Sequence, residues 1–239
     1  MKAMILAAGR GERMRPLTDT CPKPLLKVRG RPLIVWHILN LVRAGITEIV
    51  INHAHLGQQL VDTLGDGSQF GATLQYSAEA SALDTAGGIS QALPLLGDAP
   101  FVVVNGDIYC PHFDFEQVRS ALVDTDMWGN PYPADQRDIG WIYLVKNPPH
   151  VPDGDFGLTT FAVNNDGTPR YTFSGIGVYR PELFATTIAG TPAKLAPLLR
   201  DFAARGQIGG EVYRGDWTDV GTPERLAQLN RPLTESKRP

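Results

Sequence analysis

Short apolar runs alternate with segments of helical period through the first 110 residues of the chain. Several of the runs are continuously apolar, which is typical of buried strands. The pattern predicts strands at Lys2–Leu6, Glu48–Asn52, Thr73–Ser77 and Phe101–Asn105, and helices at Pro32–Ala44, Gln58–Leu64 and Gly88–Leu95. Strands that alternate with helices pair in parallel beneath helices on both faces, so we predict an α/β fold with a mixed, mostly parallel sheet.

The second half of the chain is less regular. We expect helices at Phe115–Val123, Leu195–Ala204 and Thr222–Leu229, and strands at Ile139–Val145, Leu158–Val163 and Tyr171–Tyr179. An Asn-Asn-Asp-Gly turn at 164–167 joins the last two strands, and Thr222 is typical of a helix N-cap. The prolines, glycine and charges of 127–138 indicate an irregular surface loop, and residues 231–239 form a polar tail.

Charge and hydropathy exclude two classes of partner. The net charge is -3 and there is no block rich in lysine or arginine, which excludes a nucleic-acid-binding surface. No apolar run reaches the roughly 18 residues that a membrane-spanning helix requires, and the N-terminal run is too short for a signal peptide. Cys21 and Cys110 match no metal-ligand spacing, so we expect free thiols in a reducing cytoplasm.

A loop with two glycines and several basic residues follows the first predicted strand, within Leu6–Pro24. Gly9 and Gly11 lack a Cβ, so their backbone N–H groups can approach phosphate oxygens closely. A proline on each side of Lys23 restricts the backbone there. After the two glycines, Arg13, Arg15 and Lys23 put up to three cations near the loop. The loop matches neither a P-loop nor G-x-G-x-x-G, so a tight turn with a solvated basic rim stays an alternative.

Two aspartates follow or precede predicted elements at places where ligands bind. Asp107 comes directly after the strand Phe101–Asn105, and the carboxyl edge of an α/β sheet is the usual ligand site. Asp219 precedes the helix Thr222–Leu229. Each aspartate could instead be a turn or cap residue. If the fold brings them together, their carboxylates suit Mg²⁺, which takes one or two protein carboxylates and keeps several waters.

These stretches together resemble the sugar-1-phosphate nucleotidyltransferase family, whose members join a nucleoside triphosphate to a sugar 1-phosphate and release pyrophosphate. Leu6–Pro24 is similar to the family's phosphate-binding signature, Asn105–Asp107 to its first metal site and Asp219–Thr222 to its second. The resemblance covers nearly the whole chain. It implies one Rossmann-like nucleotidyltransferase domain over residues 1–230, with a nucleotide-binding half at 1–110 and a sugar-phosphate half at 111–230.

The resemblance also assigns roles to single residues. The catalytic residues would be Arg13, Lys23, Asp107 and Asp219, of which the two aspartates would share Mg²⁺. The nucleotide-binding residues would be Ala8, Gly9, Gly11, Glu12, Arg13, Lys23, Glu79 and Gly87, with Glu79 and the backbone near Gly87 reading the base. The residues for the sugar phosphate would be Asn105, Gly154, Asp155, Gly175 and Lys194. Arg15 falls where the family varies.

The chain departs from the family pattern at two places. Asn147 stands where many members carry a phosphate-binding lysine, so we expect Lys194 to serve the sugar phosphate instead. The chain also stops soon after the core domain, so we expect no C-terminal β-helix, and a monomer. Segment 127–138 resembles an insertion.

Within the family, the chain most resembles the short bacterial N-acetylmuramate 1-phosphate uridylyltransferases of peptidoglycan recycling, on stretches such as 51–59, 194–200 and 213–222. UTP and N-acetylmuramic acid 1-phosphate are then the expected substrates. Residues 83–87 are close to a guanylyltransferase pattern, so GTP with mannose or heptose 1-phosphate is the main alternative. A catalytically inactive nucleotide-sugar-binding regulator is an alternative of another class, against which Lys23, Asp107 and Asp219 argue.

Overall fold

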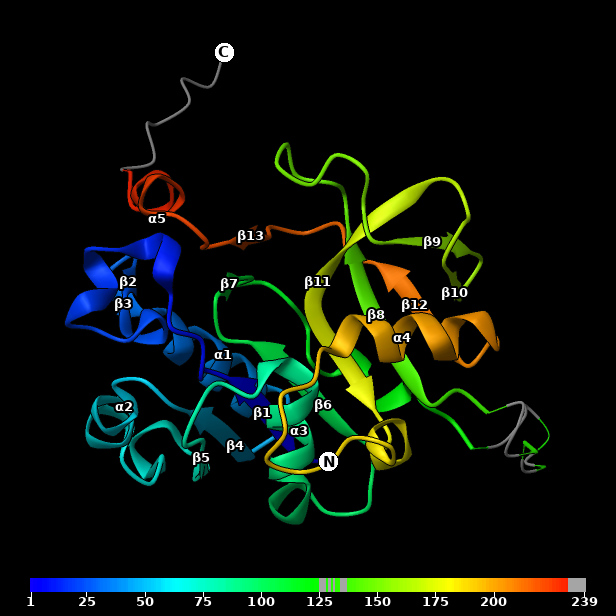
Figure 1. Cartoon of the computed structure of the whole chain (residues 1–239), viewed down its shortest axis with the longest axis horizontal. Helices are drawn as coiled ribbons and strands as arrows, with labels where there is room; N and C mark the ends of the chain where they lie inside the picture. The colour runs from blue at the N-terminus through cyan, green and yellow to red at the C-terminus, as the bar shows by residue number, and fades with distance from the viewer. Residues whose placement is uncertain (125–127, 129, 131, 134–136, 232–239) are drawn as a thin grey trace.

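The computed structural model of the chain describes residues 1–124, 128, 130, 132–133 and 137–231. Within these residues, nine strands form one sheet in the order β5-β4-β1-β6-β11-β8-β12-β10-β9 (Figure 1). Its strands are β1 (Ala3–Leu6), β4 (Glu48–His53), β5 (Thr73–Ala78), β6 (Phe101–Asn105), β8 (Gly140–Val145), β9 (Phe156–Thr159), β10 (Ala162–Asn164), β11 (Arg170–Tyr179) and β12 (Ile208–Val212). Two small sheets pair β2 (Lys27–Val28) with β3 (Arg31–Pro32), and β7 (Ile108–Tyr109) with β13 (Thr218–Asp219).

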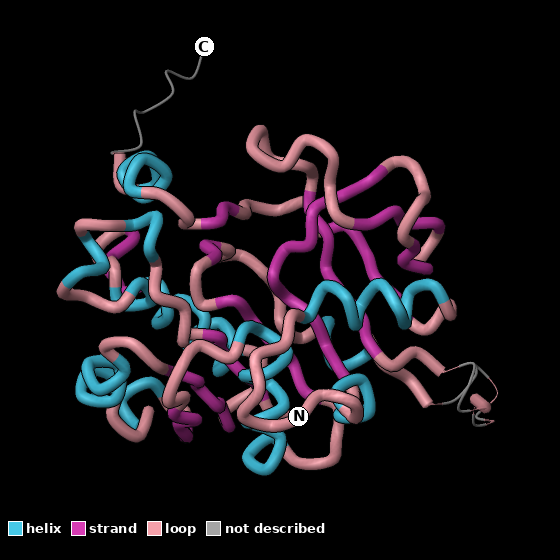
Figure 2. The backbone as a smooth tube through the Cα atoms, viewed as in Figure 1, coloured by secondary structure: helices cyan, strands magenta, loops and turns pink. Residues whose placement is uncertain are grey.

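Helices flank the sheet (Figure 2). The α-helices of the described ranges are α1 (Leu33–Arg43), α2 (Gly57–Leu64), α3 (Asp84–Leu96), α4 (Leu195–Ala204) and α5 (Pro223–Leu229). The short 3-10 turns are η1 (Glu12–Met14), η2 (Leu17–Asp19), η3 (Lys23–Leu25), η4 (Ser68–Phe70), η5 (Gln117–Ser120) and η6 (Pro181–Phe184). None of the described helices is long and apolar enough to cross a membrane.

Parallel pairing is confined to two parts of the sheet. Strands β5, β4, β1 and β6 are parallel neighbours, as the strand–helix alternation of the first half predicts. Beyond them, β11 is antiparallel to both β6 and β8, whereas β8 and β12 are parallel. The prediction of a mixed sheet flanked by helices is confirmed, and no β-helix follows the sheet in the described residues.

The pleat of the central strands divides the apolar core between the two faces of the sheet. In β1, Ala3 and Ile5 point to one face and Met4 points to the other, because successive side chains of a strand alternate. The first face packs on α1 and α2, and the second packs on α3 and α4. A third cluster, which includes Met14 and Leu226, joins the loop after β1 to α1 and α5.

Two segments of the second half differ from their prediction. The helix expected at Phe115–Val123 is reduced to η5, because its buried residues Phe115, Val118 and Ala121 recur every three positions, the period of a 3-10 helix. The strand expected at Leu158–Val163 is split into β9 and β10. Thr160 has a left-handed φ of 56°, and the chain reverses there into an antiparallel pair.

The structure differs from the sequence prediction at two further places that contain glycines. The sequence analysis did not predict strand β12, which contains Gly209 and Gly210. Gly209 packs closely on Trp141, because a Cβ at that position would lie 2.4 Å from the indole ring. Helix α3 begins at Asp84 and not at Gly88, because its packing overrides the low helix propensity of two adjacent glycines. Part of the loop predicted at 127–138, and the tail predicted at 231–239 after its first residue, lie outside the described residues.

The hydroxyl of Tyr179 tests how polar groups are balanced in the core. This side chain is fully buried in β11, and no described residue offers its hydroxyl a hydrogen-bond partner. An unpaired buried polar group costs about 1–3 kcal/mol. We expect Tyr179→Phe to raise the free energy of unfolding by about 1 kcal/mol in urea titrations. Thr172→Val, which removes a buried hydroxyl paired with Asn147, should lower it; a destabilised Tyr179→Phe would contradict the prediction.

Candidate active site

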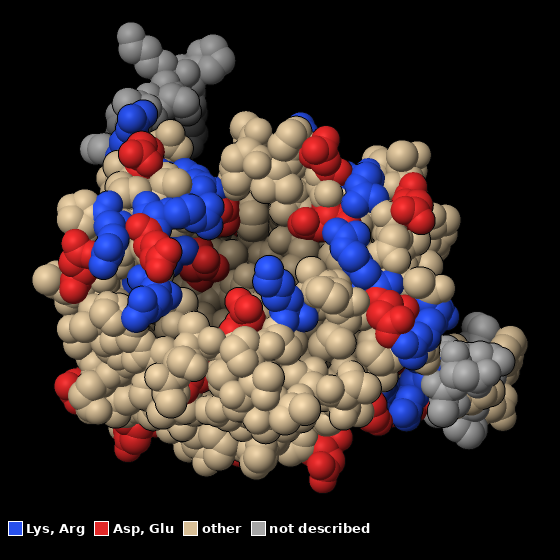
Figure 3. Space-filling view, in the orientation of Figure 1, with Lys and Arg blue, Asp and Glu red and all other residues tan. Residues whose placement is uncertain are grey.

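A cleft of about 650 Å³ opens at the carboxyl ends of the parallel strands β1, β4, β5 and β6. Strand β1 ends in register with both of its neighbours, because Leu6 pairs with Asn52 of β4 and with Asn105 of β6. Figure 3 shows the molecule hollowed on this face, with basic and acidic side chains around the hollow. The predicted site residues that line the cleft are Ala8, Gly9, Gly11, Glu12, Arg13, Lys23, Glu79, Asn105 and Asp107.

The glycine loop after β1 forms one wall of the cleft. Gly11 has a left-handed φ of 65°, and a Cβ there would lie 2.8 Å from Cγ2 of Thr18. Thr18 also holds the loop by donating its hydroxyl to the Gly11 carbonyl at 2.8 Å. Gly9 differs, because an added Cβ would meet no protein atom within 4 Å. The loop is therefore packed against protein at Gly11 and open to a ligand at Gly9.

Lys23 is the most deeply buried cation of the cleft, with 8% of its surface exposed. It begins the turn η3, and Pro22 before it is extended, with a φ of -63°. The Lys23 Nζ donates to Oδ2 of Asp107 at 2.7 Å. The lysine between two prolines is thus held against the aspartate that follows β6.

Three arginines surround the glycine loop in different ways. Arg13 lines the cleft, and so does Arg10, which the sequence prediction did not include. Arg15 instead pairs with Asp19 at 2.8 Å and lies at a smaller neighbouring pocket. Charge at the mouth of the cleft therefore comes from Arg10 and Arg13, beside Glu12.

Asp107 and Asp219 are far apart in the sequence but lie on paired segments. Strands β7 and β13 are antiparallel, with Asp219 opposite Ile108. The N–H of Val220 donates to the Asp107 carbonyl at 2.7 Å. Asp107 lines the cleft, whereas on the β13 side the lining residue is Gly221. The fold thus brings the two aspartates to neighbouring positions at the cleft edge.

Cationic side chains contact both carboxylates. Asp107 is bound by Lys23, and Asp219 is bound by Arg225 of α5 and lies 3.0 Å from Nε2 of His150. Sequence patterns did not reveal Arg225 or His150, because neither belongs to a recognisable motif. Carboxylate oxygens are the protein ligands that Mg²⁺ prefers. Among the described residues no three acidic, His or Cys side chains cluster, so water and phosphate oxygens would complete its coordination.

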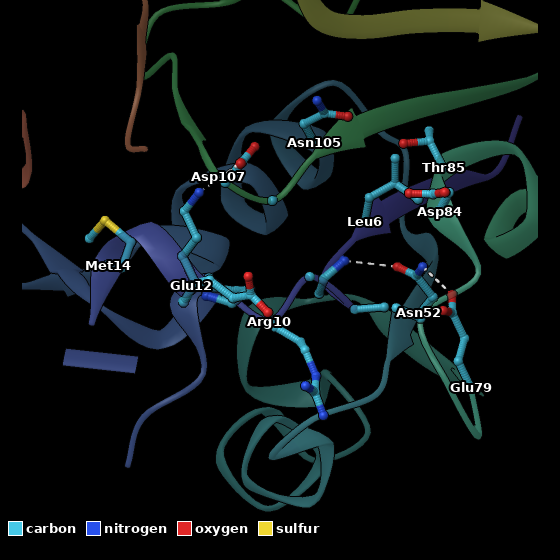
Figure 4. A pocket seen from close by; sticks show the side chains of 18 of the residues that line it. Leu6, Arg10, Glu12, Met14, Asn52, Glu79, Asp84, Thr85, Asn105 and Asp107 are labelled. Carbon is cyan, nitrogen blue, oxygen red and sulfur yellow. Dashed lines mark hydrogen bonds and ion pairs between the residues drawn. The ribbon is translucent and has the colours of Figure 1, made fainter. Parts of the chain in front are cut away.

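Glu79 follows β5 and lines the cleft, but its carboxylate is already engaged (Figure 4). Oε1 accepts from Asn52 Nδ2 at 2.6 Å, and Oε2 accepts from the Leu83 N–H at 3.0 Å. Asn52 Oδ1 in turn accepts the Ala7 N–H at 2.8 Å. Gly88 leaves room for this network, since a Cβ there would lie 2.6 Å from Oε1 of Glu79. Glu79 therefore ties the glycine loop to the start of α3, and each of its oxygens keeps a further lone pair toward the cleft that it lines.

The start of α3 forms another wall of the cleft. Residues 83–85 line it, and Asp84 has a left-handed φ of 55°, which is uncommon for a non-glycine residue. Gly87 is not among the lining residues, because it packs behind this wall with its N–H donating to the Ala193 carbonyl. Lys194 follows that carbonyl directly and is exposed, beside the cleft but not lining it.

Of the remaining residues expected to bind the sugar phosphate, one lines the cleft and three do not. Asn105 lines the cleft, and Gly175, with a φ of 84° in a bulge of β11, packs against it. The Asp155 carboxylate accepts the Phe173 N–H at 2.8 Å and so stabilises the sheet. Gly154, with a φ of 64°, packs on Asn147. Gly154, Asp155 and Gly175 are not among the described residues that line the cleft.

Asn147 holds the loop after β8 in place. Its Nδ2 donates to the carbonyls of Pro152 at 3.0 Å and Arg170 at 3.3 Å, and its Oδ1 accepts from Thr172. The same loop carries His150 to Asp219. The asparagine that replaces the family's lysine is therefore structural in this chain.

Comparisons with known proteins agree with these features. The model of a family described as nucleotidyl transferase matches residues 2–127. The N-acetylmuramate alpha-1-phosphate uridylyltransferase of Neisseria meningitidis is 52% identical over 95% of this chain and 96% of its own length. The protein of the same name from Caulobacter vibrioides is 31% identical over 98% of this chain and 97% of its own. A mannose-1-phosphate guanyltransferase of Hypocrea jecorina is 39% identical over 94% of this chain and 62% of its own.

Solved structures share the fold. A putative glucose-1-phosphate thymidylyltransferase from Bacillus anthracis, in complex with a sucrose, superposes with a TM-score of 0.80 at 23% identity, covering 96% of this chain and 94% of that one. HddC from Yersinia pseudotuberculosis, complexed with GMP-PN, superposes with a TM-score of 0.72 at 19% identity, covering 95% and 97%. The arrangement of sheet and helices is therefore common to proteins of very different sequence.

Gly9 and Gly88 form a matched pair for testing the glycine loop. Gly9→Ala should leave stability unchanged or raise it by about 0.4–1 kcal/mol, because the methyl group meets no protein atom and the unfolded chain loses freedom. The same methyl group should weaken triphosphate binding about tenfold in calorimetry, a loss of about 1.4 kcal/mol. Gly88→Ala should instead lower the melting temperature, because it collides with Glu79. Unchanged UTP affinity in a stable Gly9→Ala variant would contradict the loop's role.

Proposed function

Because the chain belongs to the nucleotidyl transferase family, we propose that it transfers the uridylyl group of UTP to N-acetylmuramic acid 1-phosphate and releases pyrophosphate. The Neisseria relative with this printed activity matches the chain over almost its whole length at 52% identity. The UDP-sugar product would return a cell-wall sugar to nucleotide-sugar biosynthesis, as in peptidoglycan recycling.

The ion pair of Lys23 and Asp107, beside the glycine loop, is the observation that carries this proposal. An oxygen of the sugar 1-phosphate, already an anion at neutral pH, attacks the α-phosphorus of UTP. A new P–O bond forms, the bond from the α-phosphorus to the bridging oxygen breaks, and pyrophosphate leaves with that electron pair. The attacking anion needs no base, and no His, Ser or Cys is among the described residues that line the cleft.

Electrostatic stabilisation and positioning then account for the rate enhancement. We assign the β- and γ-phosphates to the glycine-loop N–H groups and Arg13, and the α-phosphate to Lys23. Arg10, at the same rim, would help to neutralise the departing pyrophosphate. Each of these groups lies on the glycine loop or on η3, so one segment of the chain would bind the whole triphosphate.

Members of the family generally use a divalent metal ion. We assign Mg²⁺ to Asp107 and Asp219, since hard carboxylate oxygens on paired strands suit it. When bound, the ion neutralises charge on the phosphate oxygens and orients them. Lys23 contacts one carboxylate and Arg225 the other, so the ion would share or replace these contacts.

We assign base recognition to the backbone of residues 83–85, because hydrogen bonds from Asn52 and Leu83 already engage the Glu79 carboxylate. The sugar would lie toward Asn105, on the β11 side of the cleft. The lactyl group of N-acetylmuramic acid adds a negative charge, and Lys194 is exposed next to the start of α3. We therefore assign Lys194 to this carboxylate.

A second candidate activity is transfer of a guanylyl group from GTP to mannose or heptose 1-phosphate. The mannose-1-phosphate guanyltransferase of Hypocrea jecorina is 39% identical over 94% of this chain. Residues 83–87, at the proposed base pocket, are also close to a guanylyltransferase pattern. A regulator without catalysis is disfavoured, because binding alone does not require the Lys23–Asp107 pair.

A pyrophosphate-release assay separates the candidates. Four triphosphates would be tested against the 1-phosphates of N-acetylmuramic acid, N-acetylglucosamine, glucose and mannose. We expect the highest kcat/KM for UTP with N-acetylmuramic acid 1-phosphate, because a pyrimidine pocket excludes purines by shape and a cation attracts the lactyl carboxylate. Lys194→Ala should reduce the preference over N-acetylglucosamine 1-phosphate. Faster turnover of GTP with mannose 1-phosphate would favour the second candidate, and no release with any pair would favour the regulator.

Lys23→Ala should lower kcat by roughly 10²–10³-fold, the range for losing one preorganised electrostatic contact in a transition state. KM for UTP should rise less, because the glycine-loop N–H groups and Arg13 remain. Lys27→Ala is the matched control, since Lys27 is exposed in β2 and does not line the cleft. A Lys23→Ala variant with more than half of the normal turnover would show that Lys23 only supports the turn.

A further inference from the structure

Helix α1 carries two polar side chains that are buried as deeply as its apolar ones. His37 is 1% exposed and Asn40 is 4% exposed, among core residues such as Ile38 and Leu41. Three positions apart, the two polar residues share one face of the helix. Burying a polar group lowers the stability of the fold unless the group is hydrogen-bonded. The hydrogen-bond partners of His37 and Asn40 therefore indicate their role.

Both side chains contact the segment that follows Asp107. His37 Nε2 lies 2.9 Å from the Ile108 carbonyl oxygen. Burial lowers the pKa of His37 to about 4, so the imidazole is neutral at neutral pH, and the nitrogen that faces a carbonyl must carry the proton. Asn40 Nδ2 donates to the Pro111 carbonyl at 3.0 Å and more weakly to that of Cys110 at 3.4 Å.

The apolar side chains of Ile108, Tyr109 and Cys110 are buried in the core, but backbone pairing of this segment is short. Strand β7 is two residues long and pairs only with β13 among the described strands, through Ile108 opposite Asp219 and Tyr109 opposite Thr218. Asp107 directly precedes β7, and its carbonyl accepts the Val220 N–H. A shift of β7 would therefore move both carboxylates, and α1 supplies the side-chain donors that hold it.

We propose that His37 and Asn40 are positioning residues for the divalent-metal site, which fix residues 108–111 and, through β7 and β13, the carboxylates of Asp107 and Asp219. The proposal rests on the proposed function only in that it assigns the metal to these aspartates. Neither His37 nor Asn40 is among the described residues that line the cleft. Their N–H groups hold the backbone of residues 108–111. Asp107 directly precedes this segment, and Asp219 pairs opposite Ile108.

Two substitutions at His37 separate positioning from simple core packing. His37→Phe keeps a ring of similar size but removes the donor, whereas His37→Gln keeps an amide N–H at comparable reach. We would titrate Mn²⁺ into the enzyme with a non-hydrolysable UTP analogue and measure free Mn²⁺ by electron paramagnetic resonance. We expect His37→Phe to weaken Mn²⁺ binding about tenfold, the lower end for losing a group that orients a metal ligand. Gln should restore most of it, and Asn40→Leu should also weaken binding.

A destabilised core alone should not change metal affinity. Leu96→Ala, in α3 on the opposite face of the sheet, is the control for a lowered melting temperature. The apparent Mg²⁺ constant for turnover should follow the Mn²⁺ affinities. If folded His37→Phe bound Mn²⁺ as tightly as the unaltered enzyme, or if Leu96→Ala weakened binding equally, the proposal would be overturned. Absence of pyrophosphate release by an unaltered enzyme that binds Mn²⁺ would instead contradict the proposed function.

Discussion

The parallel register of β1 between β4 and β6 sets the position of every group in the cleft. It places Leu6 and Asn105, the last residues of β1 and β6, in one row with Asn52, the penultimate residue of β4, at the carboxyl edge of the sheet. The glycine loop follows β1, and the segment that carries Asp107 follows β6. Strand β1 is buried on both faces. A shift of its pairing by one residue would therefore move each of its side chains to the other face of the sheet. The packing of the core thus fixes the geometry of the site.

Within this frame, opposite charges are paired before any ligand arrives. Lys23 is almost fully buried against Asp107, and Asp219 has Arg225 and His150 as partners. A buried lysine without a partner would be strongly destabilising, whereas a paired one is tolerated. In the proposed complex, a phosphate would replace Asp107 as the partner of Lys23, and the metal ion would replace Lys23 as the partner of Asp107. Neither charge would then be left without a partner. Preorganisation of this kind is what stabilises charge as it develops in a transition state.

The sequence predicted the site better where the chemistry depends on backbone than where it depends on side-chain direction. The two glycines of the loop and the prolines beside Lys23 determine the local backbone conformation, so the sequence alone predicts it. Whether Glu79 faces a ligand or Asn52 depends on contacts between residues distant in the chain. Arg225 and His150 were missed for the same reason, since tertiary packing alone brings them to Asp219. In the fold, strand β12 was not predicted, because Gly209 and Gly210 carry no apolar side chain to mark a strand. The sheet nevertheless requires their small size.

The pairing of β7 with β13 has a consequence for the order of assembly during synthesis. Residues 218–220 supply Asp219 and a backbone donor to Asp107, and Leu226 of α5 packs against Met14 and other residues of the glycine-loop side. A ribosome releases the chain from its N-terminus, so the parallel strands can form long before these last contacts exist. A nascent chain would therefore hold the glycine loop and Asp107 before residues 218–220, which carry Asp219, can pair with them. Asp219 and α5 would join after every strand of the large sheet, so folding of that sheet would precede completion of the proposed acidic pair.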